Sequence, residues 1–353
     1  MSWVNDFILS GSICSLNSGE VILGWGQREL LEAPSTNGIS LYFPDFFLQT
    51  KTPWIKYEYY KKIRLSDLAS ALDQLKISKE QGIKWEEADK PQFSQTFQEL
   101  KDHFFLNDLL SKAVPYTFQK SLSRISRGRF INSLKALVTH SMDANTFLYG
   151  SWNSNEGVLG GTPELLFKQD SETPRLIKTV ACAGTCPSSA NFYDFLADKK
   201  ESREHNIVIE CINNELKPFG DVQVGDVTVK KLATLSHMYT PITLKADQKL
   251  SFVQLVNALH PTPALGAYPK KQGQKWLKAQ EQKCSRNRFG APVGYLDIDN
   301  NEFACYVAIR NMQWDQYGLS LGAGCGVVSE SHLEKEWDEI QLKLKAIKKM
   351  LAL

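Results

Sequence analysis

The chain has 353 residues, of which 42% are hydrophobic and 23% charged, and its formal net charge is +2. This composition is that of a globular protein with enough apolar residues for a large core. Lys and Arg are spread along the chain without a basic block, so a nucleic-acid partner is not indicated. The apolar runs are shorter than the ~20 residues that cross a bilayer. The N-terminus has no basic region before its apolar stretch, unlike a signal peptide. Seven cysteines without a CxxC pair argue against a disulfide framework or a zinc site, so we expect reduced thiols in a cytoplasmic protein.

Strands are predicted at the start of the chain, and helices follow them. Residues 1–60 alternate apolar and polar side chains between Gly and Pro breaks, which predicts strands and turns. The patterns in 66–77 and 92–112 predict helices, and 121–140 is predicted to run from a helix into a strand at KALVTH. Three further stretches predict successive strands: FLYGSW, GVLGGTPELLFKQ and RLIKTVACAG.

Two long helices and another pair of strands are predicted in the rest of the chain. Residues 193–217 and 332–351 each carry an apolar stripe at helical spacing. Between them, EFACYVAIRNMQW and GLSLGAGCGVV predict two strands joined at WDQYG. Strands thus come in runs, with helices grouped between the runs. This order favours an α+β fold, with large antiparallel sheets and helices packed outside, over a doubly wound fold.

A proline-rich loop, ALHPTPALGAYP, follows an apolar helix candidate. Pro261, Pro263 and Pro269 prevent the helix from continuing, and they favour extended backbone at the residues before them. The sequence therefore predicts a stiff loop that carries His260 and Thr262.

Carboxylates recur at helical spacing on the two long helices. Glu336, Glu339 and Lys343 share one face of the last helix, and Glu201 and Glu204 share a face of the earlier one. Each set alone is typical of a solvated charged face, since exposed Glu–Lys pairs are common and weak.

Polar residues at strand ends and in glycine-rich turns change that interpretation. GGTPE places Glu164 after a turn, and the small residues of ACAGTCP let a ligand approach the backbone. Arg310 ends an apolar strand, where a buried guanidinium needs an anion. GAGCG, 322–326, offers backbone N–H groups to a carboxylate. Together with the helix carboxylates, these features suit a small dianionic substrate and Mg²⁺, which prefers a few carboxylates plus water and substrate oxygens.

The same pieces resemble the chorismate-utilising enzymes, which include isochorismate synthases, salicylate synthases and the synthase components for anthranilate and aminodeoxychorismate. Over about residues 115–350 the matching stretches come in the order of that family. They are GGTPELLF, AGT, KKESREH, LSHM, LHPTPALGAYP, FGAPVGY, VAIR, AGCGVV and EKEWDEIQLK. The family fold, large antiparallel sheets with helices outside, agrees with the α+β prediction. The resemblance implies a single domain over 1–353, with a variable part over 1–114 and a catalytic, chorismate-binding part over 115–353.

The resemblance also implies roles for individual residues. Glu204 and Glu339 resemble the Mg²⁺ ligands of the family, with Glu201 and Glu336 as carboxylates near the metal. Arg310, Lys343 and the backbone of Gly324 and Gly326 resemble the groups that hold the substrate carboxylate. The remaining residues that the resemblance places at the substrate are Gly184, Thr185, His260, Thr262, Ala264 and Leu265.

The type of chemistry is indicated by the start of KALVTH. Members that add ammonia resemble one another in having Gln there, whereas members that add water have Lys, and this chain has Lys135. Attacking water must lose a proton, and a desolvated lysine can accept it. Glu164 is then expected to be the general acid that protonates the departing 4-hydroxyl. It must hold a proton at neutral pH, so its surroundings must raise its pKa.

The sequence therefore predicts an isochorismate synthase, a Mg²⁺-dependent isomerase of chorismate that needs no obligatory glutaminase partner and is a monomer. Salicylate synthase, which also eliminates pyruvate, is the nearest alternative. An ammonia-adding synthase component and a non-catalytic chorismate-binding protein are the others. The sequence leaves open whether the product serves menaquinone, a siderophore or salicylate.

Overall fold

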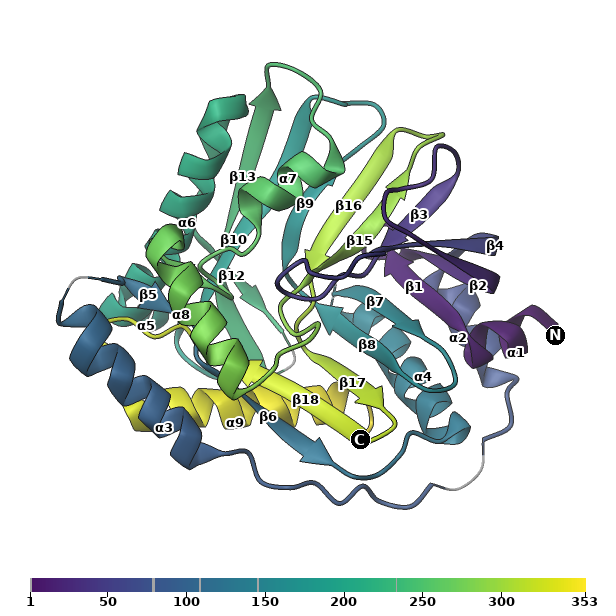
Figure 1. The fold of residues 1–353 in the computed structure, drawn as a ribbon, viewed down its shortest axis with the longest axis horizontal. Helices are drawn as coiled ribbons and strands as arrows, with labels where there is room; N and C mark the ends of the chain where they lie inside the picture. Colours follow the sequence, from purple (N-terminus) through teal and green to yellow (C-terminus); the bar gives the residue numbers. More distant parts are fainter. Residues whose placement is uncertain (1, 78–79, 108, 145, 233) are drawn as a thin grey trace.

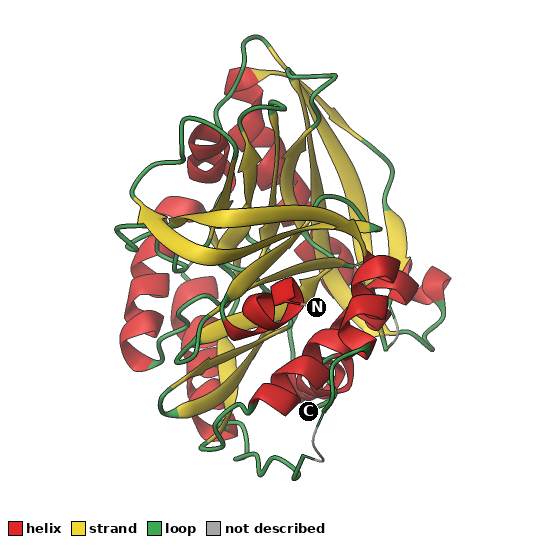
Figure 2. Cartoon of the chain, turned by 90° about the vertical axis from the view of Figure 1, so that its right-hand side faces the viewer, coloured by secondary structure: helices red, strands yellow, loops and turns green. Residues whose placement is uncertain are grey.

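The structure is a computed structural model that describes residues 2–77, 80–107, 109–144, 146–232 and 234–353. Its helices lie on the outside of a large antiparallel sheet (Figures 1 and 2). The helices, with one π and one 3₁₀ segment, are α1 (Ser2–Leu9), α2 (Leu65–Asp73), α3 (Lys90–Glu99), η1 (Leu100–Phe105), α4 (Arg127–Ala144), α5 (Phe192–Ala197), α6 (Lys199–Leu216), η2 (Lys217–Phe219), α7 (Phe252–Leu259), α8 (Lys270–Lys283) and α9 (Leu333–Met350).

Every strand pair among the described residues is antiparallel, and all strands except β5 and β14 belong to one continuous sheet. Along its main path the order is β11-β13-β10-β9-β16-β15-β3-β4-β2-β1-β7-β8-β17-β18-β6, and β12 also pairs with β13. Their bounds are β1 (Gly11–Ser15), β2 (Glu20–Leu31), β3 (Ile39–Tyr42), β4 (Trp54–Arg64), β6 (Tyr116–Ser121), β7 (Phe147–Trp152), β8 (Gly157–Thr162), β9 (Leu165–Gln169), β10 (Leu176–Pro187), β11 (Gly220–Val224), β12 (Thr228–Lys231), β13 (Leu235–Ala246), β15 (Pro292–Asp297), β16 (Glu302–Val307), β17 (Asn311–Asp315) and β18 (Gly318–Gly324). A separate short pair joins β5 (Lys112–Ala113) to β14 (Ala267–Tyr268).

Four buried apolar clusters occur among the described residues, and the two largest explain why the helices lie outside. One joins helices α2, α3, α4 and α9 to the strands beneath them, and a second joins α6 and α7 to β9, β10, β13 and β16. The third contains residues from strands and their immediate ends, such as Leu41, Tyr295 and Tyr306, and fills the space between strands. The predicted α+β fold with antiparallel sheets and outer helices is therefore confirmed.

Most of the predicted elements are confirmed, but several differ. The stretch 1–60 is not only strands and turns, because it begins with helix α1, and EFACYVAIRNMQW is not one strand but two, β16 and β17, separated by residues 308–310. KALVTH continues helix α4 and forms no strand, since Ile131, Leu134 and Val138 are buried at helical spacing. The helix predicted over 92–112 ends earlier, and Lys112 lies in strand β5; residue 108 of that range lies outside the described residues. The helix predicted over 193–217 is two helices, because Asp198 interrupts it and caps α6 by accepting a hydrogen bond from the Glu201 N–H.

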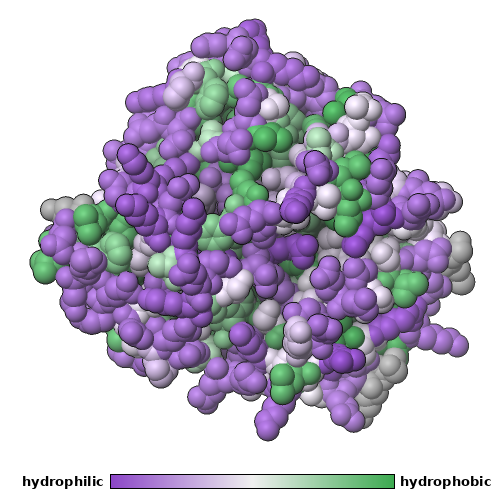
Figure 3. Space-filling model, viewed as in Figure 1, coloured by the Kyte–Doolittle hydropathy of each residue, from purple (hydrophilic) through white to green (hydrophobic). Residues whose placement is uncertain are grey.

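The outer surface is mostly polar. Figure 3 shows hydrophilic side chains over most of the face seen in Figure 1, with hydrophobic residues in scattered groups. Among the residues that the structure describes, no helix is long and apolar enough to cross a bilayer.

Candidate functional site

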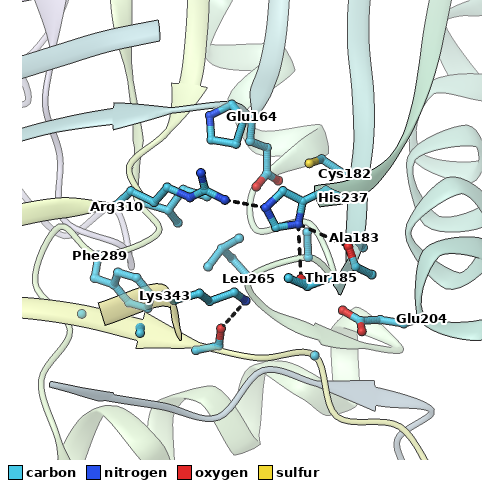
Figure 4. Close-up of a pocket in the computed structure, with 18 of the residues that line it drawn as sticks. Glu164, Cys182, Ala183, Thr185, Glu204, His237, Leu265, Phe289, Arg310 and Lys343 are labelled. Atoms are coloured by element: carbon cyan, nitrogen blue, oxygen red, sulfur yellow. Dashed lines mark hydrogen bonds between the residues drawn. The ribbon is translucent and has the colours of Figure 1, made fainter. Parts of the chain in front are cut away.

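A cavity lies where strands β10 and β18 meet helices α6 and α9, and Figure 4 shows the side chains that point into it. Ten of the residues singled out in the sequence line this cavity although they are far apart in the chain. They are Glu164, Gly184, Thr185, Glu204, Ala264, Leu265, Arg310, Gly324, Gly326 and Lys343. The fold therefore brings together the turn after β8, the irregular part of β10 at AGT, helix α6, the proline-rich loop, Arg310 and the glycine-rich end of β18.

One wall of the cavity presents a buried guanidinium. Arg310 follows β16 with a φ of 55° and hydrogen bonds to Nε2 of His237 (Figure 4). His237 Nδ1 lies 3.2 Å from the carbonyl oxygen of Gly184, so its N–H can donate there while Nε2 accepts from Arg310. Burial lowers the pKa of His237 well below its usual value, which keeps the His237 ring neutral beside the charged Arg310. Burial also lowers the pKa of Arg310, to about 10. An anion in the cavity would stabilise this charge.

Glu164 carries a carboxyl group that holds a proton at neutral pH. It follows Pro163 after strand β8, and only 3% of its surface is exposed. Burial raises its pKa to about 8, although the positive charges of Lys112, Lys343 and Arg310 act in the opposite direction. The raised pKa expected for Glu164 is therefore confirmed.

Carboxylates from α6 and α9 meet around one ammonium group. Lys200 Nζ lies 3.0 Å from Glu201 Oε1, 3.1 Å from Glu204 Oε2 and 3.2 Å from Glu336 Oε1. Burial, together with the charge of Glu204, raises the pKa of Glu201 to about 8, and burial raises that of Glu336 to about 7. Burial also opposes ionisation of Glu204, but the ammonium groups of Lys112 and Lys200 outweigh it and lower the pKa to about 2. The predicted metal-binding carboxylates of α6 and α9 thus converge on the Lys200 ammonium, and in this arrangement no three His, Cys, Asp or Glu side chains among the described residues form a group that could hold a metal ion.

The fourth carboxylate of this group is held by a lysine of its own helix. Lys343 Nζ lies 2.6 Å from Glu339 Oε1, one turn earlier on α9, and donates a hydrogen bond of 2.7 Å to the carbonyl oxygen of Gly324. Burial disfavours the charged ammonium, yet Glu339 outweighs this and the pKa of Lys343 is raised. Lys343 therefore stays charged and connects the carboxylate group to the glycine loop of β18.

Lys112 belongs to the site although the sequence analysis gave it no role. Its side chain is fully buried, and its Nζ lies 3.1 Å from Glu204 Oε1. Strand β5 places it there, because Lys112 pairs with Tyr268 on one side and its neighbour Ala113 pairs with Val327 on the other. A buried lysine beside a carboxylate that lines the cavity is a candidate proton acceptor once its own proton has been lost.

The structure does not bring Lys135 into the cavity. It lies on helix α4, where its Nζ is 3.1 Å from Asp73 Oδ1, and 75% of the Asp73 side chain is exposed. The expectation that Lys135 faces a substrate from a strand is wrong, because KALVTH is helical. This segment uses its apolar residues to pack α4 against the sheet, which turns Lys135 towards α2.

His260 and Thr262 also differ from their expected place. The helix ends before His260 as predicted, but neither residue lines the cavity. His260 Nε2 lies 2.7 Å from the carbonyl oxygen of Phe46, and the Thr262 carbonyl accepts hydrogen bonds from Leu265 and Gly266. These two residues shape the loop, whereas its later residues, Ala264 and Leu265, form the wall.

The sequence contained signals for the residues that were missed. KAVPYT at 112–117 has a lysine before apolar residues, as KALVTH does. Pro115 argued against a strand there, because proline cannot donate a hydrogen bond to a neighbouring strand. His237 lies in the matching stretch LSHM without a role of its own, and Lys200 stands in KKESREH among charged neighbours. The sequence alone does not show whether Lys112, His237 and Lys200 lie on the surface, in the core or at the site. Their burial and contacts in the folded protein show it.

Gly326 provides a test of how tightly this site is packed. A Cβ at this position would collide with the Glu204 carboxylate and lie 2.8 Å from Lys112 Cε. We expect Gly326→Ala to lower the free energy of unfolding by ~1–3 kcal/mol, because the ion-paired carboxylate cannot yield without losing contacts. Urea unfolding measures this. Gly82→Ala is the control, since nothing lies within 4 Å of its added Cβ, and an equal effect in both variants would contradict the prediction.

Comparison with known proteins supports the same family resemblance over most of the chain. Residues 49–352 match the family model described as "Chorismate binding enzyme". The chain is 33% identical over 216 residues to the "Salicylate biosynthesis isochorismate synthase" of Pseudomonas aeruginosa. The aligned region covers 59% of this chain and 45% of the relative. It is 32% identical over 210 residues to "Isochorismate synthase MenF" of Bacillus subtilis, which covers 57% and 43%.

The solved structure of DhbC from Bacillus anthracis shares the fold. Its TM-score is 0.79 at 20% identity, over 100% of this chain and 99% of that one. The two curated relatives are matched over less than half of their length. The family model, by contrast, extends over most of the chain and includes the helices and loops that meet at the cavity. The chain therefore belongs to the chorismate-binding enzyme family.

Proposed function

We propose that this protein is an isochorismate synthase, which converts chorismate reversibly to isochorismate by adding water at C2 and removing the C4 hydroxyl. The observation that carries the proposal is Glu164, a carboxyl with a pKa near 8 in the same cavity as Arg310 and Lys343. A protonated acid beside two cations suits loss of a hydroxyl from a dianion. The two curated relatives described above carry isochorismate synthase names, which supports the same reaction.

The cations and the glycine loop would hold the substrate. Arg310 offers a buried guanidinium to a carboxylate, and Lys343 lies beside the backbone of Gly324. Ala264 and Leu265 supply an apolar wall against the ring. Since these charges are fixed by buried contacts before any ligand enters, little reorganisation is needed during the reaction.

We assign proton acceptance from the attacking water to Lys112. Lys112 contacts Glu204, which lies on the lower side of the cavity in Figure 4, whereas Glu164 lies on the upper side. A base and an acid on different sides of the ring can remove a proton from water and protonate the leaving hydroxyl in the same turnover. Lys135, which the sequence favoured for this role, is held at Asp73 on another helix.

The carboxylates around Lys200 suit Mg²⁺ by their chemistry. Hard oxygen ligands from two helices surround Lys200, and among the residues that the structure describes the buried Oε2 of Glu336 has no hydrogen-bond partner. Glu204 and Glu339 would hold the ion, with Glu201 and Glu336 nearby. Bound Mg²⁺ would neutralise and orient the ring carboxylate of chorismate.

We also propose that the protein acts in the cytoplasm as a monomer, without a glutaminase partner. All seven cysteines are free, as expected in a reducing compartment. Addition of water requires no ammonia supply, so no partner is needed to release it.

Proton NMR of the protein with chorismate and Mg²⁺, with and without ammonium, tests the reaction. We expect isochorismate to accumulate without pyruvate and independently of ammonium, and EDTA to stop its formation. Pyruvate with salicylate would identify a salicylate synthase, and a product that requires ammonium would identify an amine-adding enzyme. Unchanged chorismate in every sample would contradict the proposal and leave a chorismate-binding protein.

A further inference from the structure

Lys200 lies where the carboxylates of two helices converge. Its Nζ is within 3.2 Å of oxygens of three different glutamates, Glu201, Glu204 and Glu336. Its side chain is 14% exposed, so it forms these ion pairs in a partly dry environment, where they are stronger than on an open surface. One ammonium group therefore does what a bound cation would do: it offsets the mutual repulsion of these carboxylates.

The other lysines of the site do not share this position. Lys112 forms its ion pair with Glu204 and Lys343 forms its ion pair with Glu339, each from the edge of the group. When all groups are ionised, these two lysines and Lys200 face four carboxylates, Glu201, Glu204, Glu336 and Glu339. Removing Lys200 would leave two lysines against four carboxylates. The excess negative charge would be largest where Glu201, Glu204 and Glu336 now contact the Lys200 ammonium.

A second cavity, of about 290 Å³, opens on the outer side of Lys200. Six acidic residues line it, and Lys200 and Lys335 are the lysines that line it. The acids are Asp198, Glu201, Glu330, Glu336, Asp338 and Glu339. This negative lining attracts cations, and it offers carboxylates that a displaced Lys200 ammonium could contact.

We propose that Lys200 is an internal counter-ion that competes with the divalent cation for this site, and that the acidic cavity is the route by which the cation enters and the ammonium leaves. The inference rests on the proposed function only in taking the carboxylates as the metal ligands. Its consequence is that Lys200 stabilises the metal-free protein and weakens metal binding. Its position makes metal affinity depend on a residue that is not itself a ligand.

Isothermal titration of Mg²⁺ into Lys200→Met measures this competition. Methionine keeps similar length without the charge, and we expect Mg²⁺ to bind about tenfold or more tightly than to the unmodified protein, because a positive charge ~3 Å from the ligands is removed. Lys199→Met is the matched control, since Lys199 is the preceding, exposed residue and does not line the acidic cavity. Thermal unfolding gives a second readout: without metal, Lys200→Met unfolds at lower temperature, and Mg²⁺ restores more stability to it than to the control.

Lys200→Arg keeps the result interpretable if the methionine variant folds poorly. Its charge is retained, so we expect Mg²⁺ to bind no more tightly than to the unmodified protein. Equal or weaker Mg²⁺ binding by Lys200→Met than by Lys199→Met, or tighter binding by Lys200→Arg, would overturn the inference, and so would the absence of binding heat in Lys200→Met. If Lys200→Met binds Mg²⁺ tightly and the unmodified protein nevertheless leaves chorismate unchanged, the inference stands and the proposed function fails.

Discussion

Lys112→Gln is expected to lower kcat for isochorismate formation by about 10³-fold or more, which is within the range that a positioned base contributes. Glutamine keeps most of the side-chain length but cannot accept a proton from water. Lys112 is fully buried, 3.1 Å from Glu204, which lines the cavity, so bulk water cannot take its place. Lys135→Gln is the matched variant and should keep kcat within about threefold, because Lys135 contacts exposed Asp73, and exposed pairs are weak. Proton NMR of the chorismate reaction measures both.

The second role of Lys112, neutralising Glu204, must be separated from proton transfer. Lys112→Arg keeps a positive charge beside Glu204, but a guanidinium does not lose its proton in proteins. We expect Lys112→Arg to bind Mg²⁺ normally and to remain inactive. Substantial turnover by this variant, or loss of activity in Lys135→Gln instead, would show that Lys112 is not the base.

These two lysines also show what sequence reasoning can and cannot decide. Lys112 and Lys135 both precede apolar residues, and KALVTH resembles the family stretch that begins with Lys in water-adding members, which points to Lys135 and away from Lys112. The buried side chains of Ile131, Leu134 and Val138 instead continue a helical period that begins earlier in α4. A window restricted to KALVTH hides that period, whereas the longer window reveals it. The pairing of β5 with β14 joins residues far apart in the chain, and no local pattern predicts it.

The residues that the sequence placed well share a different property. Glu164, Arg310 and Gly326 stand at turns and strand ends. At such positions an acidic, basic or glycine residue is noticeable from the local sequence alone, without knowledge of the residues that pack around it. The carboxylates of α6 and α9 have a strong helical pattern, so their common faces could be predicted even though their meeting could not. Lys200 was missed because a lysine among glutamates on a helix is usually solvated. Only its burial between two helices reveals a different role.

Glu164→Gln is expected to lower kcat by about 10²–10⁴-fold while leaving the cavity intact, because the amide is similar in shape but cannot deliver a proton. In the unmodified protein the pKa of about 8 keeps Glu164 protonated at neutral pH, so kcat should fall as pH rises through about 8. Proton NMR of the reaction at a series of pH values measures both effects. Normal turnover by Glu164→Gln would show that another group protonates the leaving hydroxyl.

The same raised pKa makes a prediction about stability that does not depend on the reaction. The folded protein keeps a proton on Glu164 up to about pH 8, whereas the unfolded chain loses it near the ordinary glutamate pKa of 4.5. Since the folded state binds more protons between these values, the contribution of Glu164 to stability falls as pH rises, by up to about 1.4 kcal/mol per pH unit. Glu164→Gln removes this dependence. Glu201 and Glu336, whose pKa values are also raised, act alike in both proteins and cancel in the comparison. Urea unfolding at pH 5.5 and pH 7.5 should therefore show a smaller loss of stability in Glu164→Gln, and parallel losses would mean that Glu164 is ionised in the folded protein and cannot be the acid.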